Sequence, residues 1–141
     1  MNQPLWRPSA AAIAASNMTA FMRAVEEQGL LDKVFLLIGV GPFKTAKGAE
    51  FMRNNVPGLY IPDSVVKRLA GAQDQAREGR KICVELIQEI RTIKGVHGVH
   101  VMAYRQEHTV AEIIERSGVL GGRKPWHPGR DPQANTNRMA S

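Results

Sequence analysis

The feature that most restricts the fold is an apolar run from Lys33 to Ile38, which ends directly in Gly39-Val40-Gly41-Pro42. A run without polar alternation is typical of a strand that is covered on both faces, as in a parallel sheet. A second strand is predicted from Val99 to Tyr104. Its residues should alternate between the two faces, with Val99, Val101 and Ala103 on one and His100, Met102 and Tyr104 on the other. We expect the two strands to lie side by side and in the same direction, joined by a long crossover.

Helical patterns occupy most of the remaining chain. Cap residues and apolar spacing predict helices over about 9–28, 45–54, 61–69, 73–93 and 109–116. Gly29, Gly95 and Gly118 follow three of these segments as typical helix ends. The order is therefore helix, strand, helices, strand, helix, which parallel strands joined by helical crossovers explain best.

Two strands do not complete a parallel sheet, because both faces and both edges of such a sheet need cover. The predicted fold class is therefore α/β, a slice of a larger repeating fold that is most simply a (βα)8 TIM barrel. Three regions are expected: an irregular N-terminal arm at 1–8, a partial TIM-barrel α/β domain at 9–120, and a disordered basic tail at 121–141.

The formal charge is +6, but its distribution argues against a nucleic-acid partner. Four basic residues against Asp131 put +3 of the excess into the segment from Gly121 to Ser141. A nucleic-acid footprint should instead cluster on a structured face. No apolar run approaches the roughly 20 residues that cross a bilayer, and no secretion signal is recognisable. With Cys83 as the single cysteine, we expect a cytoplasmic protein without a membrane partner.

Ligands of parallel α/β folds bind beyond the carboxyl ends of the strands, which are residues 39–45 and 103–107 here. Arg105 follows the second strand directly, where a guanidinium can hold a carboxylate or a polarised carbonyl by two hydrogen bonds. The alternative is a surface arginine paired with Glu107 or Glu112, and position alone leaves both open. Thr45 either caps the helix that follows it or turns its hydroxyl toward the pocket, and capping is favoured.

The other polar candidates have simpler explanations. Gly39-Val40-Gly41 resembles the start of a dinucleotide fingerprint but lacks the third glycine, so a tight turn is favoured. Tyr104 is expected to fill the barrel wall rather than to stack on a ligand. Cys83 lies in an apolar stripe and predicts a buried thiol, while Glu85 and Glu89 predict a solvated helix face. No metal arrangement is recognisable among the four histidines, His97, His100, His108 and His127.

Ordered segments of the chain resemble a known family, the methylenetetrahydrofolate reductases. Its seventh strand and helix are similar to Val34–Pro42, Thr45–Lys47, Phe51–Arg53, Val56–Gly58 and Ile61–Pro62. Its eighth strand and the helix before it are similar to Gly79–Cys83, Leu86–Ile87 and Gly95–Arg105, and its last helix to Val110–Ile114 and Ser117–Val119. The similarity runs from about Thr19 to Trp126, and its specificity rests on the order and spacing of the segments.

The resemblance implies the C-terminal portion of an FAD-carrying barrel, about the last two βα units plus a preceding helix. Members of the family use NADH or NADPH to reduce methylenetetrahydrofolate to methyltetrahydrofolate for methionine synthesis. Arg105 matches the arginine that contacts folate near the end of the last strand. Thr45 falls where many members place a glutamine that touches folate, and threonine is shorter.

The resemblance also implies what this chain leaves out. The flavin ligands and the acidic residue of the family lie in earlier barrel units, so no catalytic residue is assigned here. The chain is therefore expected to be a truncated folate-side fragment, whose partner is the missing barrel half or another copy of itself. The alternatives are a non-catalytic interaction or self-associating remnant of the barrel, and a small basic binding module.

The first 22 or so residues are similar to a second family. The segments from Pro4 to Ser9 and from Asn17 to Met22 resemble the start of acetoacetyl-CoA synthetases. The overlap is short, and an alanine-rich helix explains it equally well.

Overall fold

The computed structural model describes residues 10–57 and 59–124. The arm predicted at 1–8 and the tail from residue 125 onward lie outside these residues, as does Pro4–Ser9, the first of the two segments that resemble acetoacetyl-CoA synthetases. The elements, in chain order, are α1 (Ala10–Glu27), β1 (Leu36–Val40), α2 (Ala46–Asn55), α3 (Asp63–Ala70), α4 (Gln75–Ile90), β2 (Val96–Val101), the 3-10 turn η1 (Glu107–Thr109) and α5 (Val110–Ser117). None of the described helices is long and apolar enough to cross a membrane.

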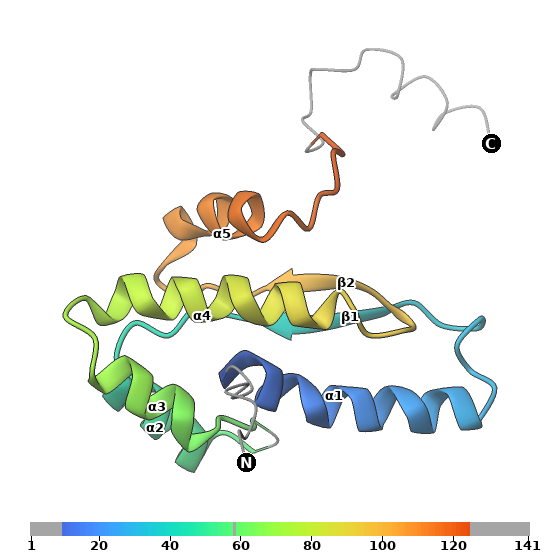
Figure 1. The fold of residues 1–141 in the computed structure, drawn as a ribbon, viewed down its shortest axis with the longest axis horizontal. Coiled ribbons are helices and arrows are strands. Elements are labelled where there is room, and N and C mark those ends of the chain that lie inside the picture. The colour runs from blue at the N-terminus through green and yellow to red at the C-terminus, as the bar shows by residue number, and fades with distance from the viewer. Residues whose placement is uncertain (1–9, 58, 125–141) are drawn as a thin grey trace, which may run out of the picture.

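The two strands form a parallel sheet, as predicted, and α2, α3 and α4 make the crossover between them (Figure 1). The register starts at Leu36 opposite Val96 and continues with Leu37 opposite Gly98. One extra residue, His97, is therefore inserted into β2 at this point, which is a β-bulge. The predicted order of helices and strands is confirmed for the described residues.

The predicted strand boundaries are wrong at both ends: the first strand starts three residues later and ends two residues later than predicted, and the second starts and ends three residues earlier. The first strand does not begin at Lys33, because Lys33 lies in a turn, and it continues through Gly39 to Val40. Gly39 pairs with His100 in the ladder, and the space where its Cβ would stand lies 2.8 Å from the Met102 side chain. The second strand begins at Val96 instead of Val99, since Gly95, with φ +85°, ends the short turn after α4 and leads into the strand.

Helix α4 is shorter than the predicted range 73–93. Its first residue is Gln75, because the Asp74 side chain caps it by accepting a hydrogen bond of 2.9 Å from the Arg77 backbone N–H. It ends at Ile90, and the Thr92 and Ile93 backbones already form tighter turn bonds. Local hydrogen bonds at the two ends therefore decide the length, whereas the apolar spacing alone overestimates it.

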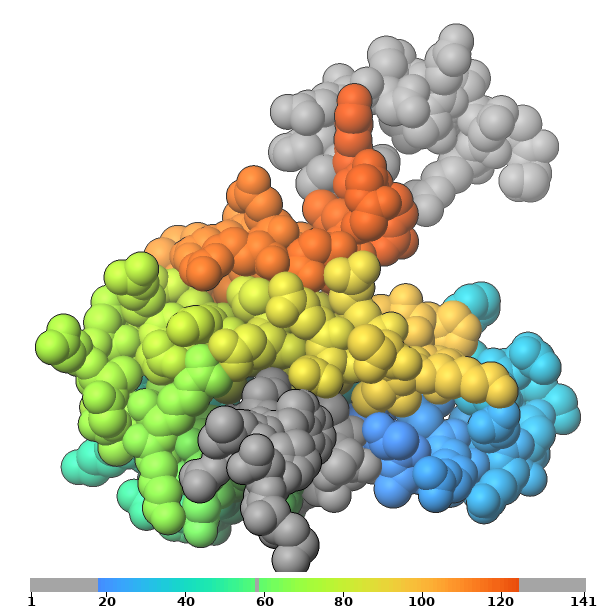
Figure 2. Space-filling view, in the orientation of Figure 1, coloured from blue at the N-terminus to red at the C-terminus, as the bar shows by residue number. Residues whose placement is uncertain are grey.

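The core lies on one side of the sheet. The helices that cover this face are seen in Figure 2, where α4 lies between α1 and α5. One buried cluster joins the sheet to α4 and α5, and its members are Val40, Cys83, Val84, Ile87, Ile90 and Ile113. A second cluster joins α2, α3 and α4, and its members are Ala49, Ile61, Val65, Leu69 and Ile82. Burial of these aliphatic side chains supplies the main stabilisation of the fold.

The opposite side of the sheet is open in the described residues. Phe35 is 86% exposed and Tyr104 is 83% exposed, and Leu37 and Met102 are also exposed. Tyr104 therefore does not fill a wall built by these residues, contrary to the prediction. The alternation of the second strand is nevertheless confirmed, because Ala103 is buried on the helix side while His100, Met102 and Tyr104 are exposed.

Candidate functional site

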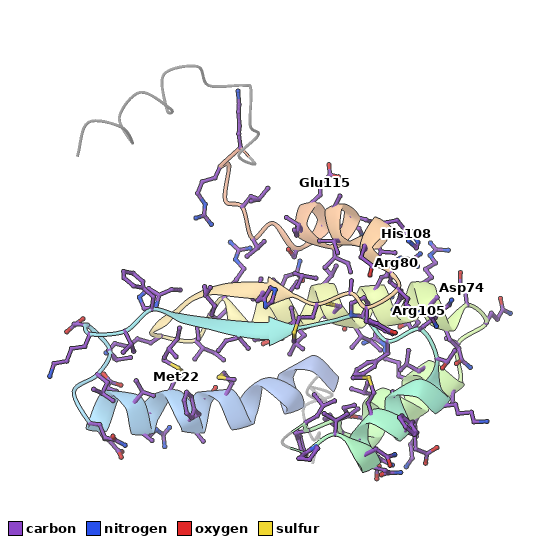
Figure 3. The ribbon with its side chains drawn as sticks, turned by 180° about the vertical axis from the view of Figure 1, so that it is seen from behind. Met22, Asp74, Arg80, Arg105, His108 and Glu115 are labelled. Atoms are coloured by element: carbon purple, nitrogen blue, oxygen red, sulfur yellow. The ribbon has the colours of Figure 1, made fainter. Side chains whose placement is uncertain are left out.

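The loops after the two strands lie at one edge of the sheet, because parallel strands end on the same side. The Met102 backbone N–H donates to the Val40 carbonyl over 2.7 Å and prolongs the pairing beyond β2. The Gln106 side-chain Nε2 then donates to the Pro42 carbonyl over 3.1 Å. Figure 3 shows Arg105 at this edge, seen from behind. The edge is thus a connected structure and not two independent loops.

Glycine permits the close approach of these loops. A Cβ on Gly41 would stand 2.3 Å from the Met102 carbonyl oxygen, a backbone atom that cannot rotate away. The Gly39-Val40-Gly41 motif therefore serves the close backbone approach that was expected, but Gly39 and Val40 lie in β1 and not in the predicted tight turn.

The first turns of α4 hold the loop after β1 from the outside. The Gln75 side-chain Oε1 accepts a hydrogen bond of 2.8 Å from the Ala46 backbone N–H, at the start of α2. A Cβ on Gly79 would stand 1.8 Å from the Phe43 carbonyl oxygen, so α4 and the loop are in direct backbone contact. Neither residue was singled out from the sequence. The available signal was a glycine inside a strong helical pattern, which often marks a packing contact.

Thr45 caps α2, as the sequence favoured. Its Oγ1 accepts a hydrogen bond of 3.0 Å from the Gly48 backbone N–H, and its own backbone is extended, with φ −146° and ψ 155°. The side chain is exposed at the sheet edge. The capping bond uses the oxygen as an acceptor and leaves the O–H hydrogen for another partner.

Arg105 has an unusual backbone. Its φ is +58°, and it is the one non-glycine residue with positive φ among those the structure describes. Its backbone N–H donates to Glu107 Oε1 over 3.0 Å. Its guanidinium lies 5.8 Å from the centre of the Tyr104 ring, within the range of a cation–π contact.

The surface ion pairs considered for Arg105 are not formed. Glu107 binds the Arg105 backbone and not its guanidinium. Glu112 is 3.1 Å from Arg80 Nε, and its other oxygen accepts from Arg116 over 2.9 Å. Within the described part of the chain, no carboxylate lies in ion-pair distance of the Arg105 guanidinium. The guanidinium is therefore exposed and able to bind an anionic or carbonyl group.

The histidines show no shared site in the described region, where no group of three or more potential metal ligands occurs. His97 Nδ1 accepts a hydrogen bond of 3.3 Å from the Leu36 backbone N–H, at the bulge. Its ring meets Phe35 edge-on, with the ring centroids 4.9 Å apart. His97 therefore stabilises the start of the sheet, at the edge opposite to Arg105. His127 lies outside the described residues.

Cys83 and Glu85 lie on α4, away from the edge. Cys83 is buried as predicted, and burial raises the pKa of its thiol to about 12. The prediction of a solvated Glu85 is wrong. Arg68 of α3 binds both Glu85 oxygens, at 2.6 and 2.9 Å, and holds the pKa of that carboxyl below its usual value by hydrogen bonding. The same arginine also binds Glu78 over 2.6 Å. Glu89, placed on the same solvated face, is only partly exposed.

Comparison with known proteins identifies the family. A family model described as methylenetetrahydrofolate reductase matches residues 13–118, which include both strands, both loops of the edge and all described helices apart from the first residues of α1. Neither the curated proteins nor the solved structures contain a significant match to this chain. The matched region is most of the chain and contains Thr45 and Arg105, so the chain belongs to the methylenetetrahydrofolate reductase family, which is by its activity a family of oxidoreductases.

Proposed function

We propose that this chain takes part in the reduction of methylenetetrahydrofolate to methyltetrahydrofolate, as the folate-side part of an NAD(P)H- and FAD-dependent barrel of the cytoplasm. The observation that carries the proposal is the exposed Arg105 guanidinium at the C-terminal edge of a parallel sheet. Ligands of this fold class bind at that edge. The family match supports the reaction class.

The chemistry of the edge suits folate. A folate has a carbonyl-bearing planar ring at one end and carboxylates at the other, and a guanidinium can bind either group with two parallel hydrogen bonds. The exposed Tyr104 ring beside Arg105 offers a face on which a planar ring can stack. Thr45 lies at the same edge, where its hydroxyl can donate one further hydrogen bond. Arg105 and Thr45 are therefore the proposed folate-binding residues.

The described residues do not fit FAD. A flavin pyrophosphate needs free backbone N–H groups at a glycine-rich turn or a helix N-terminus. At the turn after β1, the glycines face Met102, and the first N–H groups of α2 are taken by Gln75 and Thr45. FAD would therefore bind to strands other than the two described.

The open face of the sheet supports a larger barrel. Large apolar side chains at Phe35, Leu37, Met102 and Tyr104 are exposed, and among the described residues each strand is paired on one side only. An exposed apolar face with free strand edges is typical of a surface that pairs with further strands. We infer that the partner is the remainder of the barrel or a second copy of this chain.

Arg105→Ala tests the proposal. The isotopically labelled protein is titrated with methyltetrahydrofolate while the backbone amide signals are recorded by NMR. Binding should shift the signals of residues 102–107 and 41–45. Loss of one charge-assisted contact should weaken the affinity by roughly 1.5–3 kcal/mol. Arg23→Ala, which removes an exposed arginine of α1, is the charge-matched control and should bind as the wild type does. Equal affinity of Arg105→Ala and the control would remove Arg105 from the site.

A non-catalytic, self-associating protein is the second candidate, and the same exposed face favours it. Light scattering over a range of concentrations separates the two. Assembly that Leu37→Lys abolishes, together with no response to folate in the NMR titration, would favour the second candidate. A monomer that binds folate would contradict it. Tight stoichiometric binding of FAD by this chain alone would contradict the placement of the flavin on other strands.

A further inference from the structure

The left-handed backbone of Arg105 is held by the two residues that follow it, Gln106 and Glu107. An L-residue other than glycine is disfavoured in this conformation, because its Cβ approaches the backbone. Such a residue persists only where the surrounding structure determines it from several sides. Here the Glu107 carboxylate accepts the hydrogen bond from the Arg105 N–H over 3.0 Å.

Gln106 fixes the other side of the turn. It is only 8% exposed, and three of its polar groups are bonded within the edge. Its Nε2 donates to the Pro42 carbonyl, its backbone N–H donates to the Ala103 carbonyl over 2.8 Å, and its carbonyl accepts from Thr109 Oγ1 over 2.7 Å. A buried side-chain amide joined to a carbonyl 64 residues away is costly to displace. Gln106 therefore anchors the turn on the loop after β1.

The consequence is a defined direction for the arginine side chain. With φ at +58°, the guanidinium lies over the Tyr104 ring, and Glu107, the nearest acidic residue in sequence, is occupied by the backbone. If Arg105 relaxed to an ordinary right-handed or extended conformation, its side chain would leave this position.

We propose that Gln106 and Glu107 are positioning residues, which hold Arg105 in the left-handed conformation and so keep its guanidinium ready for folate. This inference rests on the proposed function only for the identity of the ligand. The two residues act through Arg105 and not on the ligand. Without them, only a fraction of the molecules would hold Arg105 in the left-handed conformation. The apparent affinity for the ligand would then fall in proportion to that fraction.

The test uses a pair of variants of the exposed Glu107. Glu107→Gln retains an oxygen that can accept from the Arg105 N–H, whereas Glu107→Ala removes it. The three-bond coupling between the amide and α protons of Arg105, together with the intraresidue NOE, reports its φ. We expect Glu107→Ala to lose the left-handed conformation and to weaken folate binding roughly 5- to 30-fold. Glu107→Gln should restore both, and the charge-matched control Glu115→Ala, on α5, should change neither (Figure 3).

A second variant and a double mutant complete the design. Gln106→Leu removes the bond to Pro42 at similar volume and should act in the same direction as Glu107→Ala. In an Arg105→Ala background, Glu107→Ala should have no further effect on folate binding, because both act through one guanidinium. An unchanged φ of Arg105 in Glu107→Ala would overturn the inference even if folate binds. A φ that responds in a protein that binds no folate would support the positioning role and refute the proposed function instead.

Discussion

Gly79→Ala sets two effects of opposite sign against each other. In an isolated helix, alanine is about 1 kcal/mol more favourable than glycine, so local propensity predicts a more stable protein. In this structure, the new Cβ would stand 1.8 Å from the Phe43 carbonyl oxygen, 2.8 Å from the carbonyl carbon and 3.2 Å from the nitrogen. All three are backbone atoms, and an ordinary carbon–oxygen contact needs about 3.3 Å or more.

The loop and the helix must therefore separate by about 1.5 Å, given the normal contact distance. Overpacking of this kind costs typically 1–3 kcal/mol, and more when backbone has to move. Because the clash is with backbone atoms, we take the upper end of this range, about 3 kcal/mol; after subtraction of the propensity gain of about 1 kcal/mol, we expect Gly79→Ala to lower the free energy of unfolding by about 2 kcal/mol. The corresponding fall in melting temperature is roughly 5–10 °C for a domain of this size.

Thermal and urea unfolding followed by circular dichroism at 222 nm measure this change. Gly48→Ala is the matched control, since Gly48 is also a helical glycine, but its Cβ would meet only the Thr45 hydroxyl oxygen, at 3.1 Å. That side-chain atom can move by a few tenths of an ångström, so the control should lie within about 1 kcal/mol of the wild type. A Gly79→Ala protein as stable as the wild type would refute the close contact between α4 and the loop that carries Thr45.

Two further predictions concern α4. Hydrogen bonds from Arg68 lower the pKa of Glu85 in the folded protein. The pair therefore stabilises the fold fully at a pH above 4.5, the ordinary pKa of a glutamate, and this stabilisation is lost as the pH falls through the lowered pKa. The free energy of unfolding, measured by urea titration, should therefore fall more between pH 7 and pH 3 in the wild type than in Glu85→Gln, by about 1 kcal/mol after allowance for the partial exposure of the pair. Equal losses in the two proteins would contradict this. With a thiol pKa of about 12, Cys83 should not react with iodoacetamide at pH 8 until urea unfolds the protein, and rapid labelling under native conditions would mean that the helix packing is wrong.

Features governed by neighbouring residues were predictable from the sequence. Thr45 caps α2 because its hydroxyl reaches the N–H of Gly48, only three residues away. Cys83 is buried because the apolar stripe of α4 has to face the core. The parallel pairing of the two strands was also predictable, because parallel strands need a long crossover and the helical segments between the two apolar runs supply one.

Features that join distant parts of the chain were decided by the tertiary structure alone. Arg68 selects Glu85 as its partner because α3 packs against α4, and the sequence shows only a carboxylate on a helix surface. Gln106 reaches Pro42 and Gly79 touches Phe43 only after the sheet and α4 have fixed the distances between their backbones. The sequence alone thus determined the elements and their order, through periodicity and capping within a few residues, and the resemblance of its ordered segments indicated the family. The positions of Arg105 and its neighbours required the packed structure, because hydrogen bonds and steric contacts between distant segments depend on distances that no local pattern encodes.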